Sequence, residues 1–309
     1  MRFTLKQLSY FVAAGQAGSI LRAAENIHVS QPSISNAISH LEDVFQLQLF
    51  IRHHAQGMSL TTAGQQMMDR ARQLLRDANE LHSLAGVLSE QVYGSINVGC
   101  FIPVAPIVTP GLCHAFLQAH TEVSVNVSED DQAGLLSKLK KGAIDLALTY
   151  DMQLDGAIEF IDLVELKPYV LLAANHPLAA EKSLSLSRLS NDPFILLDLP
   201  LSDTYFMSLF SSENIKPDVY TRTRHIEVQR GLVANGYGFS LANVRPLNQK
   251  SLDNNELAYV PLAGKHPGLT LGIAMLAKQK KTLVMETFLN YCCDQINKKT
   301  IPGMISLSN

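Results

Sequence analysis

The hydrophobic pattern of this chain changes near residue 90, and that change limits its fold more than any other feature. From Leu5 to Leu88 the apolar residues recur at helical spacing, and Pro32 is the one proline. From Ser95 onward, short β-rich runs alternate with helical stretches. Such alternation is typical of a mostly parallel sheet with helices on both faces. The pattern therefore predicts a helical N-terminal part followed by an α/β part.

The α/β part divides again into two lobes. We expect strands at 95–100, 123–127, 144–149, 193–197, 219–223 and 238–242, and helices at 104–119, 131–141, 203–212, 226–235 and 280–297. Two long extended stretches, Phe160–Ala174 and Leu257–Ala277, join the two series. The prediction is a lobe I of about 91–162 and 268–300 and a lobe II of about 163–267.

Composition excludes several classes of protein. The 25 Lys and Arg against 28 Asp and Glu argue against a globally basic binder of nucleic acid. No run of about 18 uncharged apolar residues is present, so no membrane span is expected. The four cysteines form neither a disulfide framework nor a metal knuckle, and the first residues turn polar too soon for a signal peptide. We expect a cytoplasmic protein without metal, cofactor or membrane partner.

Three short helices open the chain. The first spans residues 5–14, Ser19 is suited to cap the second, and Ser30 the third, which runs from Ser33 to Val44. The third helix leaves small polar residues on its outer face, which can approach base edges closely. This arrangement, at about 21–40, matches a helix-turn-helix. On spacing alone, a helical subdomain with a merely solvated serine-rich face fits equally well.

The next residues favour the DNA reader. Leu49–Arg52 and His53–Thr61 are expected to form two short strands around a glycine turn, a wing. The combined pattern closely resembles that of the LysR-type transcriptional regulators. The resemblance is carried by Gly18-Ser19, Ala23-Ala24, Ser30-Gln31-Pro32-Ser33-Ile34-Ser35, Ile38, Leu41-Glu42, Leu49-Phe50, Arg52, Leu60-Thr61 and Ala63-Gly64.

The resemblance implies a winged helix-turn-helix at 1–64 that binds double-stranded DNA, with its third helix in the major groove. The implied DNA contacts are Ser30, Gln31, Pro32, Ser33, Ser35 and Asn36 on the helix and Arg52 and His53 on the wing. Three features depart from the family pattern: Gln46 replaces glycine, Asn36 replaces a frequent arginine, and the wing His53-His54-Ala55-Gln56 lacks an arginine pair. These departures predict few phosphate contacts and a shallow salt dependence of DNA binding.

A coiled-coil seam is predicted at 65–90. Its apolar residues are separated alternately by four and three positions, and large residues alternate with alanine. The seam comprises Met67, Ala71, Leu74, Ala78, Leu81, Ala85 and Leu88. An amphipathic helix lying on its own domain is the alternative. We favour a dimerisation helix, as the resemblance also implies, with a homodimer or homotetramer as the assembly.

The rest of the chain, 91–300, resembles the effector-binding domain of the same family, a two-lobed Rossmann-like fold similar to periplasmic binding proteins. Parallel sheets bind ligands at the carboxyl ends of their strands. That rule selects Cys100, Phe101, Ile102, Ser128, Glu129, Thr149, Asp198, Ser202, His225 and Asn243. The resemblance places a small-molecule effector in the cleft between the lobes, and these residues predict a modestly charged or partly aromatic metabolite.

Other functions receive less support. The chain contains no Gly-x-Ser-x-Gly elbow, Walker A loop or dinucleotide glycine motif, and no catalytic residue is assigned, so an enzyme is not expected. A redox-sensing regulator based on Cys100, which would lie at a helix N-terminus, is one alternative. A solute-binding module without a DNA role is another, but it leaves residues 5–88 without a purpose. RNA polymerase is a candidate partner of the regulator.

Overall fold

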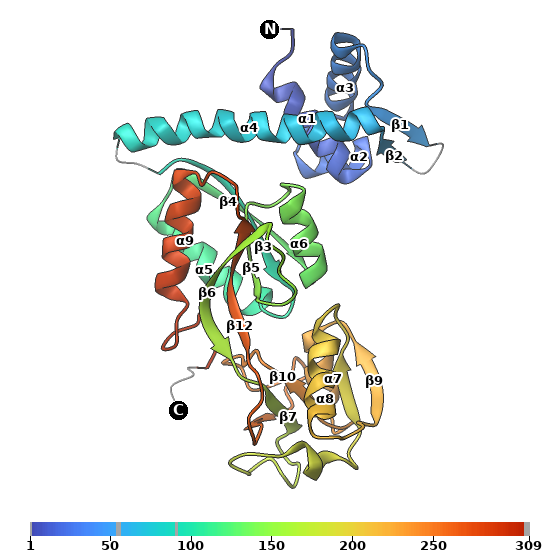
Figure 1. Cartoon of the computed structure of the whole chain (residues 1–309), viewed down its shortest axis with the longest axis vertical. Coiled ribbons are helices and arrows are strands. Elements are labelled where there is room, and N and C mark those ends of the chain that lie inside the picture. Colours follow the sequence, from blue (N-terminus) through green and yellow to red (C-terminus); the bar gives the residue numbers. More distant parts are fainter. Residues whose placement is uncertain (1, 54–56, 90–91, 306–309) are drawn as a thin grey trace. The chain divides into compact units, whose positions relative to one another are not determined.

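A computed structural model describes residues 2–53, 57–89 and 92–305, without the side chains of 79, 80 and 82–89 (Figure 1). The chain divides into two compact units, residues 1–94 with 141–143 and residues 95–140 with 144–309. The elements of the first unit are α1 (Leu5–Ala17), α2 (Ile20–Asn26), α3 (Gln31–Phe45), β1 (Phe50–His53), β2 (Gly57–Leu60) and α4 (Thr62–Ser89). This is a winged helix followed by a long helix.

Side-chain caps define where the first three helices begin. Thr4 and Gln7 form a reciprocal capping box at α1. Ser19 accepts from the backbone N–H of Arg22 at α2, and Ser30 accepts from that of Ser33 at α3, as predicted. Helix α3 begins at Gln31, two residues before its predicted start, because a proline in the first turn needs no N–H partner there.

The core of the first unit gathers the apolar faces of these helices. Phe11, Ile34, Ile38 and Leu41 are fully buried, and the rings of Phe11 and Phe50 meet edge to face at 5.5 Å. Each such side chain contributes about 1.5–3 kcal/mol by burial. The outer face of α3 therefore carries its polar residues and Pro32.

Gln46, which replaces the glycine of the family pattern, is the C-terminal cap of α3 and has a strained backbone conformation. Its φ of 53° and ψ of 40° lie in the left-handed region that glycine adopts without cost. We expect Gln46→Gly to raise the free energy of unfolding by about 0.5–1 kcal/mol, measured by calorimetry on the full chain. Gln48→Gly is the matched control: Gln48 is not among the positive-φ residues, so glycine should destabilise there. Equal effects at both positions would contradict this account.

The second unit consists of two lobes. Lobe I contains β3 (Gly94–Phe101), α5 (Ala105–Ala119), β4 (Val123–Asp130), α6 (Gln132–Lys140), β5 (Leu146–Tyr150), β6 (Ile158–Leu166), β12 (Leu269–Leu276) and α9 (Leu283–Gln295). Its strands form one sheet in the order β4-β3-β5-β12-β6, with helices on both faces (Figure 1). The observed α/β architecture is the predicted one.

Lobe II is built around smaller sheets. Its elements are β7 (Tyr169–Ala173), η1 (Leu186–Leu189), β8 (Phe194–Leu197), α7 (Ser202–Ser212), β9 (Val219–Thr223), α8 (Ile226–Ala234), β10 (Ser240–Ala242) and β11 (Leu257–Pro261). Strands β10, β7 and β11 form one sheet, and β8 pairs with β9 in another. Buried strands in both sheets and the inner faces of α7 and α8 supply the core.

The prediction of mostly parallel strands is wrong in part. Strands β3 and β5 are parallel, as are β8 and β9, but β12 is antiparallel to both β5 and β6, and β7 is antiparallel to β10 and β11. The reason is the crossing between lobes. Strand β6 carries the chain out of lobe I and β12 brings it back, so neighbours in the sheet must run in opposite directions. Each long extended stretch is accordingly two strands with a break.

Candidate nucleic-acid interface and interlobe cavity

The N-terminal end of α3 borders a shallow hollow. The hollow is lined by Gln31, Pro32, Ser35 and Asn36 of α3 and by Ile20 of α2. Residues four apart lie on the same side of a helix, which brings Gln31 above Ser35 and Pro32 above Asn36. Ser30 and Ser33 are exposed beside it, with their hydroxyls 2.8 Å apart. Four of the six residues predicted on this helix thus line one hollow.

The wing offers a second polar surface. Arg52 and His53 are exposed at the end of β1, and Nε2 of His53 lies 2.8 Å from the hydroxyl of Ser59 on β2. The wing is anchored by Met58, which is buried and donates its backbone N–H to the carbonyl of Gly18 at 2.8 Å. The predicted wing residues His54, Ala55 and Gln56 lie outside the described residues.

Three residues of the sequence motif hold the wing in place. Oε1 of Glu42 accepts the N–H groups of Leu49 at 2.7 Å and Phe50 at 3.2 Å. The hydroxyl of Thr61 accepts the N–H of Gly64 at 2.8 Å. A Cβ on Gly64 would lie 2.0 Å from the carbonyl oxygen of Leu49, which leaves room only for glycine. These positions therefore support the fold around the candidate interface.

The predicted seam on α4 separates into two parts. Met67 and Ala71 pack on the core of the winged helix, so they are already used within the unit. Leu74 is 40% exposed and Leu81 is 69% exposed, whereas the neighbouring Leu75 is half-buried against the core of the winged helix. Ala78 is half-buried, whereas Ala85 and Leu88 lie outside the residues whose side chains are described. The exposed part of the seam therefore begins at Leu74.

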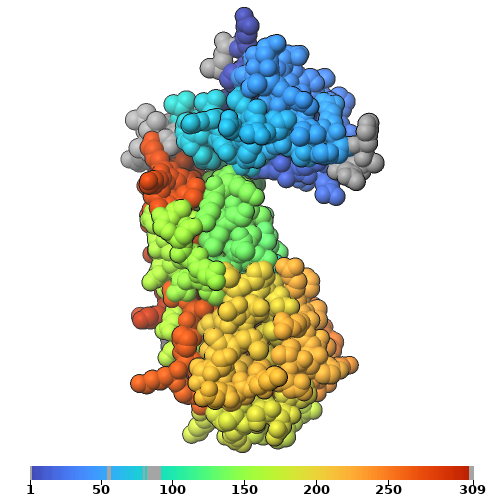
Figure 2. Space-filling view, turned by 45° about the vertical axis from the view of Figure 1, so that its right-hand side comes forward, coloured from blue at the N-terminus to red at the C-terminus, as the bar shows by residue number. Residues whose placement is uncertain are grey.

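A small cavity lies between the two lobes of the second unit. Phe101, Ser202 and Asn243 from the predicted list line it, together with Pro103, Tyr150, Leu197, Phe206, Ile226, Ala242, Val244 and Leu269. Its volume is about 20 Å³, room for about one water. On the face drawn in Figure 2, the green surface of lobe I and the yellow surface of lobe II meet without an open channel.

The other predicted cleft residues lie outside this lining. Thr149 donates to the side chain of Gln132, Asp198 pairs with Arg222 at 3.4 Å, and His225 is exposed as the N-cap of α8. Glu129 is exposed, Ile102 is half-buried, and the buried hydroxyl of Ser128 has no partner among the described residues. The rule that ligands bind at the carboxyl ends of strands (the strand-end rule) selects residues in loops. It therefore missed most of the apolar side chains that line the cavity, because these come from helices and from positions without a loop signal.

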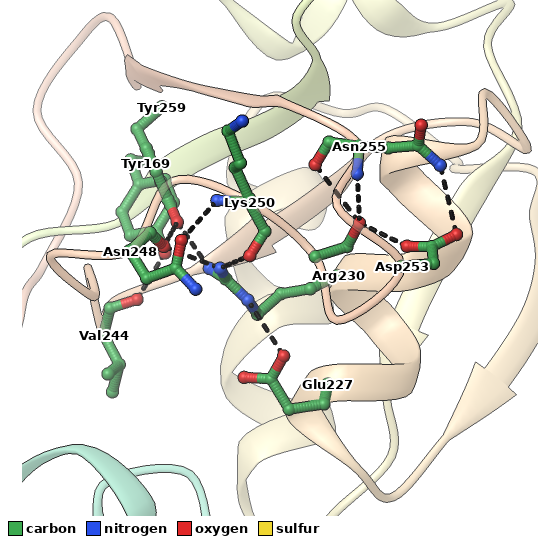
Figure 3. A network of polar contacts seen from close by, with 10 residues as sticks. Tyr169, Glu227, Arg230, Val244, Asn248, Lys250, Asp253, Asn255 and Tyr259 are labelled. Atoms are coloured by element: carbon green, nitrogen blue, oxygen red, sulfur yellow. Dashed lines mark hydrogen bonds and ion pairs between the residues drawn. The ribbon is translucent and has the colours of Figure 1, made fainter.

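A buried arginine supports the cavity wall in lobe II (Figure 3). Arg230, 2% exposed, donates to the carbonyls of Asn248 and Lys250, both at 2.7 Å, and to the hydroxyl of Tyr259. Glu227 lies 3.4 Å from its guanidinium. The hydroxyl of Tyr169 donates to the carbonyl of Val244, a lining residue. Sequence reasoning missed this network because a single arginine in a helix usually faces water.

The environment of Cys100 differs from the helix N-terminus that would activate a thiol. Cys100 is fully buried, and burial raises the pKa of its thiol to about 12. Burial also raises the pKa of Cys113 to about 11 and raises the pKa of Cys292. The activation of Cys100, which the sequence offered only as the less favoured alternative to a buried, inert thiol, is therefore not supported, because desolvation of the thiolate outweighs the helix dipole. The redox-sensing alternative is not favoured.

Alkylation tests this conclusion. In the folded chain at about pH 8 we expect iodoacetamide to modify Cys293, which is half-buried, and to leave Cys100, Cys113 and Cys292 unmodified. Mass spectrometry of the digested chain measures the modified fraction at each thiol. The urea-unfolded chain is the control and should be modified at all four. Labelling of Cys100 as fast as that of Cys293 would contradict the assigned burial.

Two further properties of the described residues limit the function. Within the described ranges, no helix is long and apolar enough to cross a membrane. The same residues contain no group of three or more His, Cys, Asp or Glu side chains placed to hold a metal ion.

Comparison with known proteins finds the same two-part organisation. Residues 5–65 match the family described as bacterial regulatory helix-turn-helix protein, lysR family, and residues 89–296 match the LysR substrate binding domain. The chain is similar to CfxR of Cupriavidus necator, an HTH-type transcriptional regulator, with 30% identity over 84% of this chain and 82% of that one.

Solved structures agree. HinK, a LysR family transcriptional regulator from Pseudomonas aeruginosa, is 36% identical, with a TM-score of 0.63 over 96% of this chain and 99% of that one. Full-length CbnR, solved with its target DNA, shares the fold at 22% identity and a TM-score of 0.55 over 94% of this chain and 98% of that one.

Proposed function

Because this chain belongs to the LysR family of bacterial transcriptional regulators, we propose that the polar face of α3 and its wing read an operator and that the interlobe cavity receives the controlling effector. The observation that carries the proposal is the joint presence of two surfaces in one chain. One is a polar helix face suited to base edges, and the other is a closed cavity between two lobes.

The proposed DNA contacts are those of the α3 surface and the wing. Gln31 and Asn36 carry amides that can pair with adenine, and the small hydroxyls of Ser33 and Ser35 allow close approach to the groove. Arg52 and His53 would contact the phosphate backbone or the minor groove. With one arginine among these residues, the logarithm of affinity should fall only slowly with the logarithm of salt concentration.

Recognition of an operator in this way needs two copies of the chain. One recognition helix spans only a few base pairs, whereas two linked readers bind half-sites about 34–36 Å apart. We propose that the seam from Leu74 onward pairs two chains and that the winged helix ends near residue 64 and the linker helix near residue 90. A homotetramer and a contact with RNA polymerase are further parts of the proposal, which places the protein in the cytoplasm, where bacterial promoters lie.

The effector acts through the lobes. Strands β6 and β12 join them, so a ligand that widens the cavity must change their relative angle. In a paired molecule, that change would alter the spacing of the two readers and the bend of the operator. We propose that Phe101, Ser202 and Asn243 contact the effector directly, and that Glu129, Asp198 and His225 face the wider opening.

The proposal is tested by selecting genomic fragments that the full chain binds, with and without candidate metabolites. The expected result is a small set of fragments sharing a two-fold symmetric site, with a footprint and small-angle scattering profile that change when the effector is added. Binding of all fragments with equal affinity would refute the proposed operator recognition. An unchanged footprint and scattering profile would refute the proposed coupling to the effector.

A further inference from the structure

The interlobe cavity contains a buried hydrogen-bond acceptor that the protein leaves unused. Asn243 lines the cavity, is 6% exposed, and has no partner for its Oδ1 atom among the described residues. Its Nδ2 donates to the carbonyl of Leu166 at 2.8 Å and to the hydroxyl of Tyr205 at 3.1 Å. A carbonyl can only accept, so the nitrogen must be the atom on that side. The oxygen is therefore the atom of this amide that no described residue pairs.

The remaining lining is mostly apolar and carries no charge. Phe101, Tyr150 and Phe206 supply three aromatic rings, of which the first two meet edge to face at 5.3 Å. Tyr150 and Ser202 add two hydroxyls, and none of the lining residues is Asp, Glu, Lys, Arg or His. A charged ligand group would lose its hydration here without gaining a counter-ion, which is strongly unfavourable.

The charged groups near the cavity are mostly engaged by other residues. Arg222 pairs with Asp198 at 3.4 Å and Arg224 with Asp131 at 3.1 Å, and the guanidinium of Arg245, next to the lining residue Val244, lies 5.5 Å from the ring centre of Tyr259. Helices α7 and α8 begin at the cavity, and helix N-termini attract anions. However, each already has an acidic residue in its first turn, Asp203 and Glu227. The N-terminal dipoles of α7 and α8 are therefore compensated, whereas α5, which begins two residues after the lining residue Pro103, has no acidic residue in its first turn.

We propose that the effector is an uncharged, ring-bearing molecule whose O–H or N–H group donates a hydrogen bond to Oδ1 of Asn243. This inference rests on the proposed function of the cavity and names the class of its ligand. The aromatic side chains favour a flat ring, and the two hydroxyls can pair with a second polar group on it. Since the cavity holds about 20 Å³, a ring must part the lobes or displace a side chain to enter.

Four benzyl compounds of similar size test the class of ligand on the full chain. Benzyl alcohol is an uncharged donor, benzyl methyl ether lacks the donor, benzylamine is cationic and phenylacetate is anionic. We expect benzyl alcohol to bind most tightly, with about a tenfold lower Kd than the ether, because the ether leaves Oδ1 unpaired. Saturation-transfer NMR titrations give the four constants. Equal binding of alcohol and ether, tightest binding by a charged compound, or no binding at all would overturn the proposal.

Two variants assign the preference to Asn243. Asn243→Leu removes the acceptor and should make the alcohol and the ether bind equally. Tyr205→Phe is the matched control, since it disturbs the same hydrogen-bond network but keeps Oδ1, and should retain the preference. A preference that survives Asn243→Leu would refute the assignment. Operator binding by each variant is measured in parallel, so that loss of the ligand preference with intact DNA binding counts against this inference alone.

Discussion

A Leu81→Asp chain is expected to be monomeric at micromolar concentration and to bind its operator about 10²–10⁴-fold more weakly than the wild type. The side chain of Leu81 is 69% exposed, so within one chain it contributes little to stability. In a paired molecule it would be buried at the seam, where a carboxylate loses its hydration without a partner. The avidity of two linked readers would then be lost. Sedimentation velocity and gel shift measure the two effects.

Leu81→Met is the matched control for this prediction, because it keeps an apolar side chain of similar volume and should preserve the dimer. The thermal unfolding of the winged helix should be unchanged in both variants, since Leu81 lies outside its core. A Leu81→Asp chain that remains dimeric would show that the copies pair elsewhere. Unchanged operator affinity in a monomeric variant would show that pairing is not needed for recognition.

The winged helix was predictable from sequence because its signals are local. Ser19 and Ser30 cap their own helices, and Ile34, Ile38 and Leu41 repeat at helical spacing toward one core. The seam was predictable only in spacing. Nothing in its period distinguishes Met67 and Ala71, which pack on the unit's own core, from Leu74 and Leu81, which stay exposed. That division depends on where the three preceding helices end in space.

The cavity was less predictable, because its lining comes from distant segments. The strand-end rule identified Phe101, Ser202 and Asn243, but Phe206 and Leu269 follow no polar or glycine signal. The state of Cys100 shows a related limit. The sequence favoured a buried, inert thiol over a reactive one at this strand end but could not decide between them, and the packing of lobe I covers Cys100 completely. Long-range packing, which a single sequence does not encode locally, decides both features.

Recognition of DNA should depend most on Ser35, the residue at the centre of the α3 surface. It is half-buried in the hollow formed with Gln31, Pro32 and Asn36, so a larger side chain there cannot turn aside without disturbing its neighbours. In the proposed complex, the small hydroxyl of Ser35 would allow the helix to enter the major groove. The phosphates and the acceptor atoms of the bases give that groove a negative potential.

We therefore expect Ser35→Glu to weaken operator binding by about 10²–10³-fold, because like charges brought together at an interface cost several kcal/mol. Fluorescence anisotropy with a labelled operator measures the change. Ser208→Glu adds the same charge on the exposed face of α7, in the other unit, and should leave the affinity within about twofold. Equal losses in the two variants would mean that net charge and not the α3 surface controls binding. Unaltered affinity in Ser35→Glu would exclude this helix end from the groove.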